Sequence, residues 1–153
     1  PAQHFLLAFF SSRLPSDFAV MDIEGNLLEK KASKEWPLHL AVYRHKPEVR
    51  GVIHTHSTYA VLWGMQCVPG ALDVMPDITP YLRMKLGTVG CVEYAMPGSK
   101  ELFDAFEKEA DHSEGWLLAR HGTVVPGKTI LDAFYAQEEL EEMAKILWEM
   151  QGK

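Results

Sequence analysis

The stretch GVIHTHSTYA, residues 51–60, decides how the rest of the chain is interpreted. Two histidines, His54 and His56, follow a short apolar run that contains β-branched residues and favours a strand. On a strand, residues i and i+2 project from the same face, so both rings can converge on one point while Thr55 points away. The residues from Ser57 onward have the pattern of a helix. The stretch therefore predicts a strand–helix junction that presents two imidazoles, a group well suited to zinc and related ions.

The segments on either side predict strands that alternate with helices. Residues 18–30 predict a hairpin that turns at Gly25-Asn26, and residues 32–47 predict a helix with Ser33 at its N-cap. Downstream we expect a short helix and a strand near 89–94, an amphipathic helix over 98–110, an apolar strand that runs into His121 and resumes after it, and a long helix over 129–150. This pattern indicates an α/β protein whose order of elements is mixed rather than strictly βαβ.

Composition limits the classes of function. A chain of 153 residues has the size of one domain, and 47% hydrophobic residues are enough for a substantial core. The net charge is −6 and the 15 basic residues form no stripe, which argues against a nucleic-acid partner. The early apolar run at 5–10 is too short to span a bilayer, so no membrane segment is expected. Cys67 and Cys91 have no CxxC spacing, which indicates free thiols and a cytoplasmic protein.

A third histidine and one glutamate complete a candidate metal site. Catalytic zinc sites use three protein ligands and keep one position open. His121 ends an apolar strand and precedes Gly122, which lets the chain turn sharply beside a bound ion. Glu35 is the candidate for proton transfer, because it lies in the first turn of its predicted helix, where the dipole favours a carboxylate.

Each of these residues also has an ordinary structural interpretation when taken alone. A strand with two histidines need not bind metal, and a first-turn glutamate such as Glu35 commonly caps its helix. Tyr81 by itself is typical of a core or loop aromatic residue. The remaining histidines are expected to be ordinary polar groups; they are His4, His39, His45 and His112.

In combination, the motifs resemble the class II aldolase/adducin-like family. The resemblance rests on Ser33-Lys34-Glu35, on His54-Thr55-His56 and on His121-Gly122, followed by a long terminal helix. It implies one class II aldolase-like domain over residues 1–153, a three-layer α/β/α fold with a mostly antiparallel central sheet. The family also has an Asn-containing glycine loop and a Thr-Gly turn upstream, which residues 1–17 lack. We therefore expect part of the N-terminal region to be missing.

The resemblance also implies roles for individual residues. His54, His56 and His121 would bind a divalent cation, expected to be zinc with manganese as the alternative. Glu35 would contact the ion in the resting state and act on the substrate as acid and base. Ser33 would bind phosphate, and Lys34 would either assist it or point to solvent. Tyr81 is the positional candidate for a tyrosine that reaches into the site of a neighbouring subunit and donates a proton.

The implied activity is that of a carbon–carbon lyase acting on a small phosphorylated sugar or sugar acid through an enediolate. The segments TPY…M…G and HG…V.GK are most similar to the branch that includes 3-oxo-tetronate 4-phosphate decarboxylases. A fuculose-phosphate-type aldolase, which yields dihydroxyacetone phosphate and an aldehyde, is the first alternative. An epimerase or dehydratase and a non-catalytic adducin-like binding domain are further alternatives. Family members are typically homotetramers, so a homo-oligomer is expected.

Overall fold

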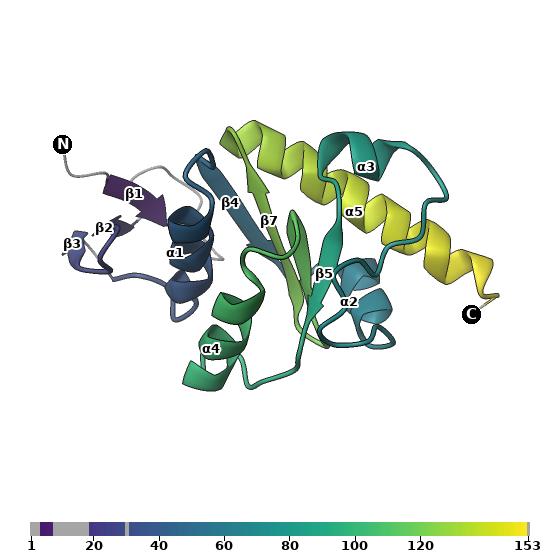
Figure 1. Cartoon of the computed structure of the whole chain (residues 1–153), viewed down its shortest axis with the longest axis horizontal. Coiled ribbons are helices and arrows are strands. Elements are labelled where there is room, and N and C mark those ends of the chain that lie inside the picture. The colour runs from purple at the N-terminus through teal and green to yellow at the C-terminus, as the bar shows by residue number, and fades with distance from the viewer. Residues whose placement is uncertain (1–3, 8–18, 30, 153) are drawn as a thin grey trace.

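The computed structural model describes residues 4–7, 19–29 and 31–152 of the chain (Figure 1). The strands are β1 His4–Leu7, β2 Ala19–Asp22, β3 Leu27–Glu29, β4 Gly51–Thr55, β5 Val89–Val92, β6 Gly115–Leu118 and β7 Gly122–Gly127. The helices are α1 Trp36–His45, α2 Thr58–Gly64, α3 Tyr81–Lys85, α4 Lys100–Glu109 and α5 Ile130–Met150. Strands and helices alternate irregularly along the chain, as expected for a mixed α/β order.

The central sheet has four strands in the order β4-β7-β6-β5. β7 pairs antiparallel with both β4 and β6, and β5 pairs parallel with β6. The sheet is thus mixed and mostly antiparallel, as predicted. Because β4 and β7 run in opposite directions, the end of β4 lies beside the beginning of β7, with Thr55 opposite Thr123.

Helices cover both faces of this sheet and make the fold three-layered (Figure 1). Alternate residues of a strand face opposite sides, so Trp116 packs under α1 and α4 while Leu117 packs under α2, α3 and α5. β5 and β6 are buried along their whole length because both faces are covered.

The N-terminal hairpin forms as predicted. β2 and β3 pair antiparallel, and β1 adds to β2 in a separate three-stranded sheet. The turn places Gly25 at φ +94°, a conformation that glycine adopts without strain. Asn26 donates from its backbone and side-chain nitrogens to the Asp22 carboxylate, each at 2.8 Å.

The prediction of a helix over 32–47 was wrong at its start. α1 begins at Trp36, and Glu35 occupies the N-cap position rather than the first turn. The Ser33 hydroxyl accepts a hydrogen bond from the Glu35 backbone N–H at 3.1 Å. Such local serine bonds compete with helical bonding, so the segment before Trp36 forms a turn and Ser33 is not the N-cap.

A second correction concerns His56. The predicted strand ends at Thr55, so His56 lies one residue beyond β4 rather than on it. Pairing with β7 ends at Thr55 and Thr123, and the chain then turns into α2.

In the described residues, no helix is long and apolar enough to cross a membrane.

Candidate metal centre

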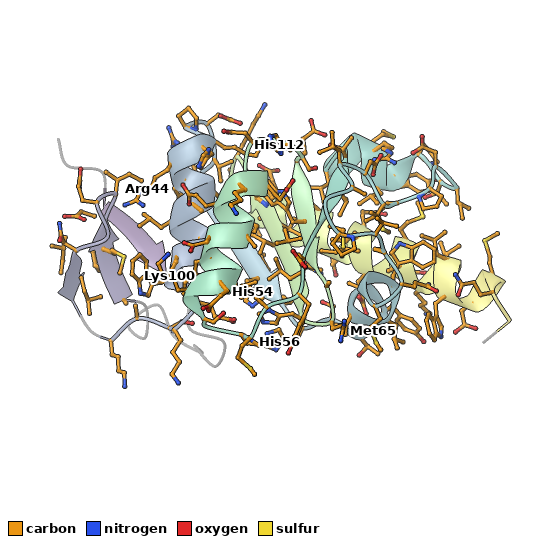
Figure 2. The ribbon with its side chains drawn as sticks, turned by 60° about the horizontal axis from the view of Figure 1, so that its bottom comes forward. Arg44, His54, His56, Met65, Lys100 and His112 are labelled. Carbon is orange, nitrogen blue, oxygen red and sulfur yellow. The ribbon has the colours of Figure 1, made fainter. Side chains whose placement is uncertain are left out.

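The candidate site lies where β4 ends and β7 begins. His54 is on β4, His56 follows that strand, and His121 immediately precedes β7. Figure 2 shows His54 and His56 close together at the lower edge of the molecule, in the middle part of its length. The antiparallel pairing of β4 with β7 therefore brings together histidines that are 65 or more residues apart in the sequence.

Four side chains of these segments converge on one point. The Glu35 Oε2 atom is 3.0 Å from His54 Nε2, and Glu35 Oε1 is 3.2 Å from His121 Nε2. The three imidazole centroids are 4.9 to 5.1 Å apart. One ligand atom from each of Glu35, His54, His56 and His121 lies within 4.8 Å of the others. The arrangement offers three nitrogen donors and one carboxylate oxygen to a single ion.

Hydrogen bonding among the described residues fits a bound cation. His54 Nδ1 lies 2.7 Å from the Thr123 carbonyl oxygen; because a carbonyl only accepts, Nδ1 donates this hydrogen bond, and Nε2 is the ring nitrogen that faces the cluster. Within the described ranges, both ring nitrogens of His121 and Oε1 of Glu35 are buried without a hydrogen-bond partner, although Oε1 and Nε2 are within ion-pair distance. Orphaned buried polar atoms are costly, and a cation would satisfy those that face the centre.

The charge state of the cluster also suits a metal. Burial alone would raise the pKa of Glu35, but its contacts with His121 and His54 outweigh burial and hold the pKa well below its usual value. Glu35 is therefore ionised at neutral pH. Burial, followed by the charges of His54 and His121, lowers the pKa of His56. A lowered pKa favours the neutral imidazole, which is the form that binds metal.

The cluster opens to solvent on one side. His121 is buried and Glu35 and His54 are partly buried, whereas His56 is exposed. His56 therefore marks the side from which a ligand can reach the cluster. This is the asymmetry expected of a metal that keeps one position for substrate.

Comparison with known proteins identifies the family. The model of the class II aldolase and adducin N-terminal domain matches residues 8–148. The chain belongs to this family. It is 40% identical over 139 residues to a 3-oxo-tetronate 4-phosphate decarboxylase of Haemophilus influenzae, covering 88% of this chain and 65% of the relative. It is 34% identical over 131 residues to an L-fuculose phosphate aldolase of Methanococcus vannielii, covering 85% and 68%.

Solved structures agree with this assignment. The putative aldolase/epimerase/decarboxylase YgbL of Klebsiella pneumoniae superposes with a TM-score of 0.86 at 28% identity, covering 97% of this chain and 79% of that one. An L-fuculose 1-phosphate aldolase superposes with a TM-score of 0.80 at 32% identity, covering 97% and 69%. The class II aldolase fold is confirmed. The chain spans 54–65% of the length of the first decarboxylase relatives.

The two residues predicted to bind phosphate adjoin the cluster in this class II aldolase family member. Ser33 is partly buried and its hydroxyl accepts from the Glu35 backbone, whereas Lys34 is exposed beside Gly98. The structure therefore assigns Ser33 a local structural contact. Phosphate binding by either residue stays a prediction.

Tyr81 lies far from the cluster of its own chain. It is 59% exposed at the start of α3, and Leu86 just after this helix packs against Gly115 at the beginning of β6. The candidate metal centre adjoins Gly122, which pairs with Leu118 at the opposite end of β6. Tyr81 could thus contribute only to the site of another chain, and that role stays a prediction.

Sequence reasoning missed several residues that surround the histidines. Thr123 holds His54 through its carbonyl, and Thr55, Ser57 and Gln137 hydrogen-bond beside it. Gln137 did give a signal, because it is a polar residue on the buried face of α5 between Ala136 and Leu140. A single buried glutamine in an apolar helix face commonly has specific partners.

Proposed function

We propose that this chain forms the metal-binding domain of a zinc-dependent carbon–carbon lyase that acts on a small phosphorylated sugar acid. The reaction best supported is decarboxylation of a 3-oxo-tetronate 4-phosphate. The observation that carries the proposal is the convergence of Glu35, His54, His56 and His121, in a chain 40% identical to a protein of that name. Zinc is favoured over manganese because three of the four donors are imidazoles.

The chemistry needs a charge-stabilising centre and a group that moves protons. A divalent cation would act as a Lewis acid and stabilise the negative charge left when the carbon–carbon bond breaks. Glu35 is ionised and rests against His54 and His121, so it can first accept a proton and later return one. In the decarboxylation, carbon dioxide leaves, and the carbon that carried it receives a proton that Glu35 has taken from solvent water. The exposed side of the cluster, at His56, would admit the substrate.

Aldol cleavage is the second candidate reaction. A relative at 34% identity and a solved structure at 32% identity carry the name of an L-fuculose phosphate aldolase. The same four side chains serve both reactions, because each leaves electrons beside a carbonyl after the bond breaks. In aldol cleavage, Glu35 would remove the substrate hydroxyl proton, and an aldehyde would leave in place of carbon dioxide.

Assembly into a homotetramer belongs to the same proposal. Large apolar side chains on α3 and the first half of α5 are exposed together; they are Tyr81, Met84, Ile130, Leu131, Phe134 and Tyr135. Contiguous exposed apolar surface commonly marks a subunit interface.

Two further parts of the proposal concern the substrate phosphate and the compartment. Ser33 and Lys34 would bind the substrate phosphate near Glu35. The free thiols of Cys67 and Cys91 suit a reducing compartment such as the cytoplasm.

The test combines metal analysis with two assays on the longest form of this protein. We expect about one zinc per chain and release of carbon dioxide from 3-oxo-tetronate 4-phosphate. Glu35→Gln should keep the metal and lose about 10²–10⁴-fold in kcat, since it loses its proton-transfer group. His121→Ala should lose the metal.

The possible outcomes separate the alternatives. Metal without carbon dioxide release, but with cleavage of fuculose 1-phosphate, would support the aldolase. Near-normal kcat in Glu35→Gln would remove the role given to Glu35. Absence of metal from the unaltered protein would refute the metal-dependent lyase altogether.

A further inference from the structure

We propose that Gln137 is a positioning residue for the metal centre, acting through a closed ring of four hydrogen bonds behind the histidines. The ring also contains the hydroxyls of Thr55, Ser57 and Thr123. This inference rests on the proposed metal site and extends it to residues that would not touch the ion.

The four hydrogen bonds form a continuous ring, in which each side chain bonds to the next. Gln137 Nε2 donates to Ser57 Oγ at 3.0 Å, and Ser57 Oγ is 2.6 Å from Thr55 Oγ1. Thr55 Oγ1 is 3.0 Å from Thr123 Oγ1, which donates to Gln137 Oε1 at 2.5 Å. The ring thus joins the end of β4, the beginning of α2, β7 and α5 at one place.

Counting protons shows why a glutamine completes the ring. Thr123 has one hydroxyl proton and uses it to donate a hydrogen bond to Gln137. Thr55 must therefore donate to Thr123, and Ser57 must donate to Thr55. Gln137 supplies the fourth proton through its amide. If the Gln137 amide is flipped, so that its nitrogen donates to Thr123, every hydrogen bond in the ring reverses its direction. Each group then still donates one hydrogen bond and accepts one. A side chain that combines a donor and an acceptor in this way is needed at position 137.

The ring reaches the metal ligands through the backbone. Thr55 is the residue between His54 and His56, and Ser57 follows His56 directly. Thr123 is fully buried, and its carbonyl oxygen accepts a hydrogen bond from His54 Nδ1. Fixing these three hydroxyls therefore fixes the backbone that carries two ligands and the acceptor that orients His54. Groups that orient metal ligands commonly change metal affinity when they are removed.

A purely structural role would have a different signature. If the ring only joined α5 to the sheet, its loss would lower the free energy of unfolding and leave the zinc affinity of the folded protein unchanged. A positioning role requires that zinc affinity falls in protein that is still folded. The two roles can therefore be separated by measuring zinc Kd and unfolding on the same variants.

The experiment titrates zinc into metal-free protein against a chelating dye and follows urea unfolding of the same samples. Gln137→Met keeps the volume and removes both polar atoms, and Gln66→Met makes the same change at an exposed site. We expect Gln137→Met to weaken zinc binding by about 10–100-fold, and Gln66→Met to leave it unchanged. Thr123→Val should weaken binding in the same way, and Thr123→Ser, which keeps the hydroxyl, should restore it.

Each outcome decides between the possibilities. A Gln137→Met protein that folds and binds zinc with unchanged Kd would overturn the inference and leave the metal centre intact. If Gln137→Met does not fold, Thr55→Val removes one hydroxyl at constant volume, and an unchanged Kd in that variant overturns the inference. If the unaltered protein binds no zinc, the proposed metal centre fails and this inference with it.

Discussion

At the scale of single residues, the candidate site depends on how closely two backbones approach. A Cβ atom on Gly122 would lie 2.1 Å from the Thr55 carbonyl oxygen and 3.1 Å from His56 Cδ2. Only glycine lets the segment after His121 pass this near to β4. The glycine thus brings the third histidine to the first two.

Gly122→Ala should therefore disturb stability and metal binding together. The added methyl meets backbone rather than a movable side chain, so we expect the free energy of unfolding to fall by at least about 2 kcal/mol. Zinc affinity should fall as well, because the two backbones must separate. Urea unfolding and zinc titration would measure the two effects.

Gly64→Ala is the matched control for that substitution. Gly64 ends α2, and a Cβ there would meet its nearest neighbours at 3.8 Å, which is ordinary contact. We expect a change within about 1 kcal/mol, toward greater stability. Equal losses in both variants would contradict the close-approach explanation.

At the scale of elements, a histidine connects the two helices that cover one face of the sheet. His45, in the last turn of α1, lies 2.8 Å from Glu107 Oε1 on α4 and 2.7 Å from Asp111 Oδ2 just beyond that helix. The bond to Glu107, with a further contribution from Asp111, raises the pKa of His45 above its usual value. His45 thus joins α1 to α4 through ion pairs, a contact that the sequence did not predict.

The raised pKa predicts a stability that depends on pH. Because the folded form binds the proton more tightly than the unfolded chain, the contribution is complete below the unfolded pKa of about 6.5 and is lost as pH rises through the folded pKa. His45→Gln should thus cost about 0.5–1 kcal/mol near pH 5.5, and less near pH 9, since the acidic partners are exposed. Urea unfolding at both pH values measures this. In a Glu107→Gln, Asp111→Asn background, adding His45→Gln should have the same effect at both pH values, and a persisting difference would assign the pH dependence elsewhere.

At the scale of the whole molecule, the proposed tyrosine and the proposed metal centre lie at opposite ends of the sheet. Tyr81 is exposed on α3 among the apolar residues of the proposed interface, while Glu35 lies against the histidines at the other end. One chain cannot supply both groups to one site. If Tyr81 acts in the reaction, the active unit is an assembly of chains.

Mixing two damaged chains tests this arrangement. We expect Glu35→Gln and Tyr81→Phe each to have low activity when produced alone. Co-produced in equal amounts, they should recover about one quarter of wild-type activity, because random assembly gives that share of sites an intact Glu35 and an intact neighbouring Tyr81. Carbon dioxide release would be the assay. Co-production of Glu35→Gln with the double variant is the control, and a mixture no more active than the mean of its parents would exclude the shared site.

The sequence by itself determined what depends on local periodicity and local chemistry. The hairpin at Gly25, the strand before His54, the amphipathic α4 and the long α5 follow from spacings of two or about four residues, which each segment carries alone. Only the combination of their motifs pointed to Glu35, His54, His56 and His121 as one site, and the structure brings the four side chains together. Their binding of a metal stays a prediction.

The tertiary structure decided what depends on distant segments. The register of β4 against β7 sets the distance between His54 and His121, and no local pattern encodes that register. The start of α1 was predicted too early, because the Ser33 hydroxyl accepts the Glu35 backbone N–H and this local bond competes with helical hydrogen bonding. The ring through Gln137 could not be predicted, because its four members come from segments that meet only when α5 packs on the sheet. Local periodicity is a property of one segment, whereas a site built from hydrogen bonds between segments exists only after they have packed together.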